Sequence, residues 1–218
     1  MVYQGSISSD DGSLEMNTEV ALIIGNGTSR KSLDLLRMVS LLGENRPVIY
    51  GCNALYREYS PSYELPDHLI AIDEGIIAEI KSYGFPNHRL VIPPEEERWE
   101  PAEMHGGGSR PRSNAGMCAM SEAIKRGATT LLCVGFDSFL QDADQSVSNL
   151  FDDTINYGPE TRASVYDNPN RVRFMAWFAR KNPDVSFIFV YPEGMDAVPI
   201  GESNVYQTTY EELVRQAG

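Results

Sequence analysis

The chain has 218 residues, 42% of them hydrophobic, and a formal net charge of −13 at pH 7. This length suffices for one α/β domain with a sizeable core or for two very small domains. The negative charge argues against broad binding of nucleic acid or of an anionic membrane, because like charges repel. Three separated cysteines and three histidines show no metal-binding spacing, which predicts free thiols and no metal site.

The N-terminal segment is polar and acidic and lacks the basic and apolar regions of a signal peptide. We expect residues 1–18 to be a flexible lead-in to a single domain over residues 19–218. No apolar run approaches the ~20 residues of a membrane span, so we expect a cytoplasmic protein that is not integral to a membrane. The sequence is compatible with a homo-oligomer.

Apolar segments alternate with helical patterns along the chain. The expected strands are residues 20–24, 48–50, 68–72, 89–92, 130–134 and 185–191, and the expected helices are 29–42, 74–83, 114–126, 169–181 and 210–216. This alternation predicts a Rossmann-like α/β fold, with a doubly wound, mainly parallel sheet and helices on both faces. Residues 135–168 lack periodicity, and we expect a lid or small subdomain there. Residues 93–111, rich in Pro, Glu and Gly, form either a lid hinge or a plain loop.

The turn after the first strand reads GNGTSRKS, residues 25–32. It nearly fits a P-loop and a dinucleotide fingerprint, but Arg30 stands where each needs a glycine. Gly25 and Gly27 allow a ligand to approach the backbone, and Asn26 offers a donor and an acceptor to a ribose or base. Ser29 is expected to cap the next helix, whose N-terminal amides attract an anion. The alternative interpretation is a tight turn and a capped helix that bind nothing.

Three stretches follow one another within residues 20–140: ALIIGNGTSRKSLD, VIYGCNALY and RSNAGMCAMSEAIKRGATTLLCVGFDSFL. Together they resemble the CMP-sialic-acid-dependent sialyltransferases of glycosyltransferase family 42. In that family Gly-Asn-Gly-Pro-Ser follows the first strand and Arg-Cys-Asn follows a later one. Arg-x-Thr-Ser-Gly then precedes a helix, and another strand ends in Gly-x-Asp-Phe-Tyr. The likeness continues weakly through residues 171–180 and 186–191.

The resemblance implies a Rossmann-like, nucleotide-sugar-dependent glycosyltransferase with a CMP-activated acidic sugar as donor and a saccharide as acceptor. It implies no required metal or other cofactor. The residues that it places at the nucleotide or donor are Gly25, Asn26, Gly27, Ser29, Asn53, Arg112, Asn114 and Asp137. The sequence supports part of this placement independently, because Arg112 precedes a predicted helix N-terminus at Ser113 and Asn114. A guanidinium and free amides can converge there on one anion.

The residues expected to do chemistry match less well. Phe139 stands at the position of the family's Tyr, and residues 162–170, which correspond to the region of its catalytic His, contain no His. Asp167 is the candidate base, Tyr166 lies beside it, and Tyr157 is a candidate contact to a phosphate. A catalytically inactive nucleotide-binding or scaffold protein is therefore an alternative.

A second, weaker likeness is to the archaeal-type pterin pyrophosphokinases and similar motility-accessory proteins. They share a Gly-x-Gly-Pro-Ser opening and a strand that ends in Asp. This alternative implies an enzyme that uses ATP, with Mg²⁺ held by Asp73 and Glu74. The competing interpretation is that these two residues cap the following helix.

Overall fold

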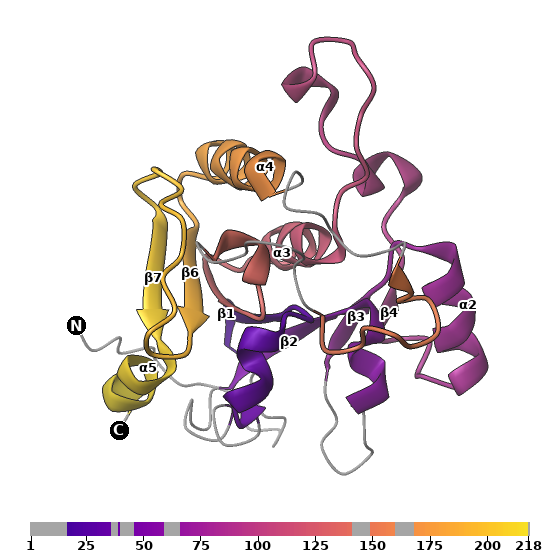
Figure 1. The fold of residues 1–218 in the computed structure, drawn as a ribbon, viewed down its shortest axis with the longest axis horizontal. Coiled ribbons are helices and arrows are strands. Elements are labelled where there is room, and N and C mark those ends of the chain that lie inside the picture. The colour runs from indigo at the N-terminus through magenta and orange to yellow at the C-terminus, as the bar shows by residue number, and fades with distance from the viewer. Residues whose placement is uncertain are drawn as a thin grey trace, which may run out of the picture.

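The computed structural model describes residues 17–35, 39, 46–58, 66–140, 149–159 and 168–217. Within them lies a seven-stranded sheet of order β4-β3-β2-β1-β5-β6-β7, in which every neighbouring pair is parallel (Figure 1). The strands are β1 (Asn17–Ile24), β2 (Pro47–Cys52), β3 (His68–Ile70), β4 (Leu90–Val91), β5 (Thr130–Val134), β6 (Ser186–Tyr191) and β7 (Val205–Thr209).

The longer helices are α2 (Glu74–Tyr83), α3 (Ala115–Lys125), α4 (Asn168–Lys181) and α5 (Tyr210–Ala217). Short 3-10 helices are η1 (Thr28–Ser32), η2 (Asn53–Glu58), η3 (Glu95–Arg98), η4 (Ala102–Met104) and η5 (Asp137–Phe139). The segment that carries η3 and η4 projects away from the body of the molecule in Figure 1.

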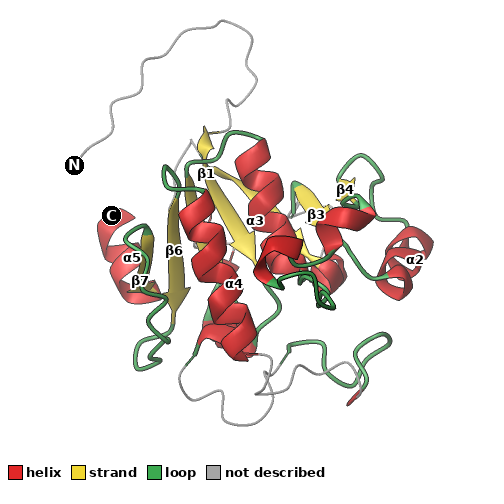
Figure 2. Cartoon of the chain, turned by 90° about the horizontal axis from the view of Figure 1, so that it is seen from above, coloured by secondary structure: helices red, strands yellow, loops and turns green. Residues whose placement is uncertain are grey.

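The core has two halves, one on each face of the sheet. In β1, Ala21 and Ile23 pack with buried residues of α3 and α4, whereas Leu22 and Ile24 pack with those of α2, η2 and α5. Figure 2 shows α3 and α4 lying across one face of the sheet. Side chains of a strand point to alternate faces, so a strand covered on both sides must be apolar throughout. The predicted Rossmann-like α/β fold is confirmed.

The strand order changes direction at β1, which has β2 on one side and β5 on the other. Ile24, the last residue of β1, pairs with Gly51 of β2 and with Val134 of β5. The carboxyl ends of the three strands therefore lie at one level. In open α/β sheets a ligand binds in the crevice beyond the carboxyl ends of the strands, where the connections that follow neighbouring strands run to opposite faces of the sheet.

The structure corrects the expectation for residues 29–42. The segment starts as the 3-10 helix η1, with Gly27 at its N-cap and Leu33 already extended. Ser29 therefore lies inside η1 and does not cap it, and its side chain bonds elsewhere. Leu35 and Val39 are again helical, while residues 36–38 and 40–42 lie outside the described part of the chain.

Other differences concern the ends of the chain. β7 was not expected, because its five residues have no continuous apolar run and its Tyr206 and Gln207 are exposed. Among the described strands, β7 lies at the edge of the sheet and pairs only with β6, so its apolar pattern is weaker. β1 begins at Asn17, inside the expected lead-in, whose residues 1–16 lie outside the described range.

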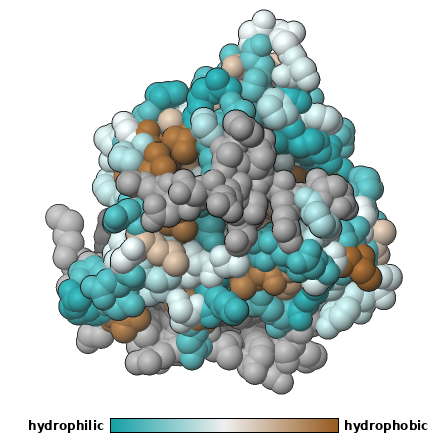
Figure 3. All heavy atoms as spheres, viewed as in Figure 1, coloured by the Kyte–Doolittle hydropathy of each residue, from teal (hydrophilic) through white to brown (hydrophobic). Residues whose placement is uncertain are grey.

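The described part of the chain contains no helix that combines the length and the apolar character of a membrane span. The face in Figure 3 is largely hydrophilic, and its hydrophobic residues form small separate groups.

Candidate functional site

A pocket of about 650 Å³ lies at the carboxyl ends of β1, β2, β3 and β5. Its walls are the turns after these strands, the first residues of α2 and α3, parts of residues 149–157 and Arg171 of α4. This is the crevice at the change of strand direction, where such folds bind ligands.

The pocket brings together most of the residues that the sequence analysis selected. Those that line it are Gly25, Asn26, Gly27, Asn53, Arg112, Ser113, Asn114, Asp137 and Tyr157. Ser29 is buried behind the first turn. Asp167 and Tyr166 lie outside the described residues. Lining residues that the sequence analysis missed are Asn149, Asp152 and Asn156, which come from a segment without a periodic pattern.

Asp137 holds the glycine-rich turn in place. Its Oδ2 accepts hydrogen bonds from the Ser29 backbone N–H at 2.9 Å and from Thr28 Oγ1 at 3.2 Å, and its Oδ1 accepts one from Ser29 Oγ. Asp137 and Ser29 are only 7% and 3% exposed. Both carboxylate oxygens bind the turn, so Asp137 fixes the position of the turn at the pocket.

Gly27 is the point where the turn comes closest to Asp137. A Cβ at Gly27 would overlap the Asp137 carboxyl group and would lie 2.7 Å from the Gly135 carbonyl oxygen. The backbone N–H groups of Gly25 and Gly27 donate to the carbonyl groups of Val134 and Gly135 at 2.8 and 2.9 Å. The turn after β1 is thus bonded along its length to the turn after β5, and only glycine fits at residue 27.

Arg30 braces the same turn from the side away from the pocket. Its side chain is 4% exposed, and Nε donates to the Gly25 carbonyl oxygen at 2.7 Å. Its two terminal nitrogens bind the carboxylate of Glu58, at the end of η2, at 3.1 and 2.7 Å. The arginine that departs from both phosphate-loop patterns is therefore a structural tie between β1 and η2.

Two asparagines that line the pocket have buried side-chain oxygens without a hydrogen-bond partner among the described residues. Asn26 Nδ2 donates to the Cys52 carbonyl oxygen at 3.0 Å, and Asn53 Nδ2 donates to Asp73 Oδ2 at 3.3 Å. Because each nitrogen faces an acceptor, these bonds fix which end of each amide is the oxygen. Both Oδ1 atoms are buried, and neither accepts a hydrogen bond from any residue that the structure describes. Asn53 also has a left-handed backbone with φ of 45°, a strain that is common at ligand sites.

Another part of the lining places a guanidinium next to a helix N-terminus. Asn114 Oδ1 accepts from the Met117 backbone N–H at 2.9 Å and so caps α3 at the pocket wall. Arg112 donates to the Ile72 carbonyl oxygen at 3.0 Å and to Glu95 at 2.9 Å, and its guanidinium lies 4.9 Å from the centre of the Trp99 ring. These contacts fix the guanidinium beside the α3 N-terminus, where an anion is favoured.

Two lining residues that could act as nucleophile or base are held neutral. Burial raises the pKa of Tyr157 to about 12, so at neutral pH this phenol can donate a hydrogen bond but cannot act as a base. Burial also raises the pKa of Cys52 above its usual range, which disfavours the reactive thiolate.

The two acidic residues after β3 have separate partners. Asp73 stands at the N-cap of α2 without a capping bond from its side chain, and its carboxylate accepts from Asn53. Glu74 is exposed and pairs with Arg98 at 3.0 Å. Neither side chain caps α2 in the predicted way. Within the described ranges, no three His, Cys, Asp or Glu residues are grouped as metal ligands would be.

Comparisons of the chain with protein-family models, with curated proteins and with solved structures give no match.

Proposed function

We propose that the chain binds a nucleotide-activated sugar in this pocket and transfers the sugar to a saccharide acceptor. The proposed donor is of the CMP-linked acidic type. The observation that supports binding best is the pair of buried amide oxygens, Asn26 Oδ1 and Asn53 Oδ1, which lack a donor among the described residues and belong to residues that line the pocket. A buried acceptor without a partner costs about 1–3 kcal/mol. In the proposed complex each amide turns its oxygen towards the pocket, where a hydroxyl or amino donor of the ligand offsets this cost.

The remaining walls suit the other parts of a nucleotide. The α3 N-terminus and Arg112 offer amides and a guanidinium to a phosphate. Gly25 and Gly27 let the turn pack directly against Gly135 and Asp137, and the bonds from Asp137 and Arg30 keep that turn rigid at the pocket. A site whose groups are already positioned loses less freedom on binding.

In the proposed transfer, an acceptor hydroxyl attacks the anomeric carbon of the donor sugar. The bond between that carbon and the phosphate oxygen breaks, the nucleotide leaves with the electron pair, and the hydroxyl proton passes to a base. Tyr157, as a neutral phenol, is the candidate donor to the leaving phosphate. Asp167 and Tyr166 stay the candidates for the base.

Thermal unfolding with CMP, UDP and ATP, each with and without Mg²⁺, tests this proposal. A ligand at 100 times its Kd stabilises a protein by about 2.7 kcal/mol, which is roughly 5–10 °C for a domain of this size. We expect CMP to raise Tm without metal. A rise only with ATP and Mg²⁺ would favour the pyrophosphokinase alternative, and no rise with any nucleotide would reject both enzyme hypotheses.

Asn53→Ala locates the binding event. It removes an amide that lines the pocket, and we expect it to abolish the rise in Tm caused by CMP. Asn87→Ala is the matched control. Asn87 is exposed and lies before the amino end of β4, whereas the pocket lies at the carboxyl ends of the strands. An undiminished rise in Asn53→Ala would place the nucleotide elsewhere.

A further inference from the structure

Residues 149–159 form part of the pocket wall and contact the glycine-rich turn. It contributes Asn149, Asp152, Asn156 and Tyr157 to the lining. At its start, the Leu150 backbone N–H donates to the Asn26 carbonyl oxygen at 2.8 Å, and Asn149 forms a β-bridge with Gly27. The position of this segment therefore sets the shape of the pocket.

Few apolar contacts hold the tip of the segment. Residues 153–156 are exposed, and Ile155 at the tip is 74% exposed. Burial of apolar surface can therefore contribute little to its position, and polar anchors must supply the rest.

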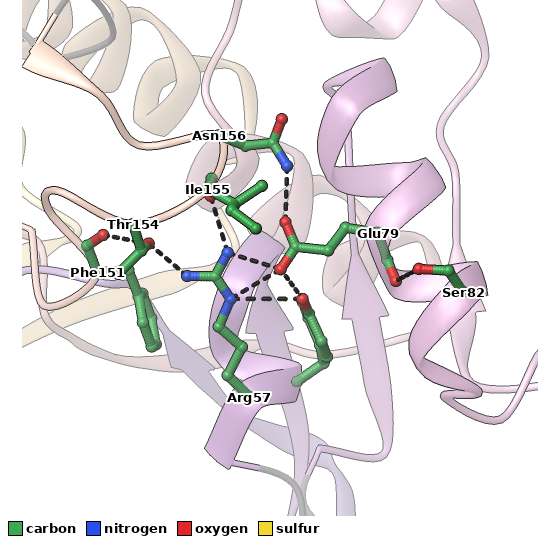
Figure 4. Close-up of polar contacts among 8 residues, drawn as sticks. Arg57, Glu79, Ser82, Phe151, Thr154, Ile155 and Asn156 are labelled. Carbon is green, nitrogen blue, oxygen red and sulfur yellow. Dashed lines mark hydrogen bonds and ion pairs between the residues drawn. The ribbon is translucent and has the colours of Figure 1, made fainter.

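Arg57, on η2, provides the main anchor (Figure 4). Its guanidinium donates to Thr154 Oγ1 at 2.5 Å and to the Ile155 carbonyl oxygen at 2.8 Å. The same group lies 5.5 Å from the centre of the Phe151 ring and 5.7 Å from that of Tyr157. One side chain thus contacts four residues of the segment.

Glu79, on α2, holds Arg57 in this position and binds the segment as well. Its Oε1 accepts from Arg57 at 2.9 and 2.6 Å, and its Oε2 accepts from Asn156 Nδ2 at 2.6 Å. Burial opposes ionisation of Glu79, but hydrogen bonds from Tyr56, Arg57 and Asn156 outweigh it and hold its pKa below the usual value. Both partners are therefore charged at neutral pH.

We propose that Arg57 and Glu79 are positioning residues that hold residues 149–159 closed over the pocket. Neither residue lines the pocket, so they act on a ligand only through the segment. If the segment opens, the competent fraction of the protein falls and the apparent Kd rises in inverse proportion. The inference relies on the proposed function only for the choice of CMP as ligand.

A fluorophore on the tip of the segment reports its motion without any ligand. Ile155→Cys provides an exposed thiol, and the natural cysteines Cys52, Cys118 and Cys133 are buried, so a maleimide dye will label residue 155 selectively. In this background we expect Arg57→Ala to lower the fluorescence anisotropy of the dye. Unchanged anisotropy would overturn the anchoring role.

Arg46→Ala is the matched control. Arg46 also binds a carboxylate through two nitrogens, at 2.8 and 2.7 Å to Asp67, but this pair lies at the amino ends of β2 and β3. We expect it to lower stability without changing the anisotropy. An equal fall in both variants would mean that general loosening, and not loss of the anchor, frees the segment. Circular dichroism at the assay temperature confirms that each variant is folded.

Titration with CMP then tests the effect on the site. We expect binding to be at least tenfold weaker in Arg57→Ala, intermediate in Arg57→Lys, and unchanged in Arg46→Ala. Unchanged affinity in Arg57→Ala would overturn the link between the anchor and the pocket. If the parent protein does not bind CMP, the proposed function fails, whereas the anisotropy comparison still decides whether Arg57 holds the segment.

Discussion

Removal of the Asp137 carboxylate should loosen the turn that forms the floor of the pocket. In Asp137→Ala the backbone N–H and the hydroxyl of Ser29 lose their shared acceptor in a site where Ser29 is 3% exposed. Each buried donor left without a partner costs about 1–3 kcal/mol, whereas Thr28 is only partly buried and can bond to water. We therefore expect the free energy of unfolding to fall by about 4 kcal/mol.

Asp137→Asn should cost much less, about 1 kcal/mol. One amide oxygen still accepts from the Ser29 backbone, and the new NH₂ group can donate to the Ser29 hydroxyl, which also accepts. Urea unfolding followed by circular dichroism measures both changes, and an unchanged m value supports the comparison. Asp184→Ala, at an exposed turn, is the control. A loss below about 1 kcal/mol in Asp137→Ala would refute the bracing role.

Three further changes test the surroundings of the pocket. Gly27→Ala should cost about 1–3 kcal/mol in urea unfolding, because its Cβ would overlap Asp137; full stability would show that the turn can move. Arg30→Met leaves the Gly25 carbonyl without its donor and should lower the free energy of unfolding by about 2 kcal/mol. The other partner, Glu58, is 41% exposed and can bind water instead. Unchanged stability would contradict the role of Arg30 as a structural tie. Burial raises the pKa of the Cys118 thiol from 9.0 to about 11, so the unfolded chain loses this proton first as pH rises. The free energy of unfolding should therefore fall by about 3 kcal/mol between pH 9 and pH 11 because of this thiol. Cys118→Ala should lack this fall. Equal pH profiles of stability for the two proteins from pH 8 to 11 would contradict the burial of the thiol.

The sheet could be predicted because its inner strands are buried on both faces. Residues 20–24 and 130–134 are continuous apolar runs, which few structures other than a covered parallel strand can use. Each run ends in a glycine turn, and parallel strands bring such turns to one edge of the sheet. Arg112 was expected near the donor from the family resemblance, and the start of the helix with its capping Asn114 agreed with that placement only in part.

Side-chain partners far apart in the chain could not be predicted. Ser29 looks like a helix cap within its own segment, yet it bonds to Asp137, 108 residues away. Arg30 looks like an exposed residue of a first helical turn, yet it is buried against Gly25 and Glu58. No local pattern encodes these contacts, because they depend on which turns the fold brings together.

The most direct test of nucleotide binding is calorimetric titration of CMP, without metal, into the wild-type protein, Asn26→Ala and Asn87→Ala. Asn26 lines the pocket and carries one of the buried amide oxygens, whereas Asn87 is exposed. We predict saturable binding with one site in the wild type and in Asn87→Ala, and binding at least tenfold weaker in Asn26→Ala, about 1.4 kcal/mol. No saturable heat in the wild type, or equal affinity in all three proteins, would contradict the assignment of this pocket to a nucleotide.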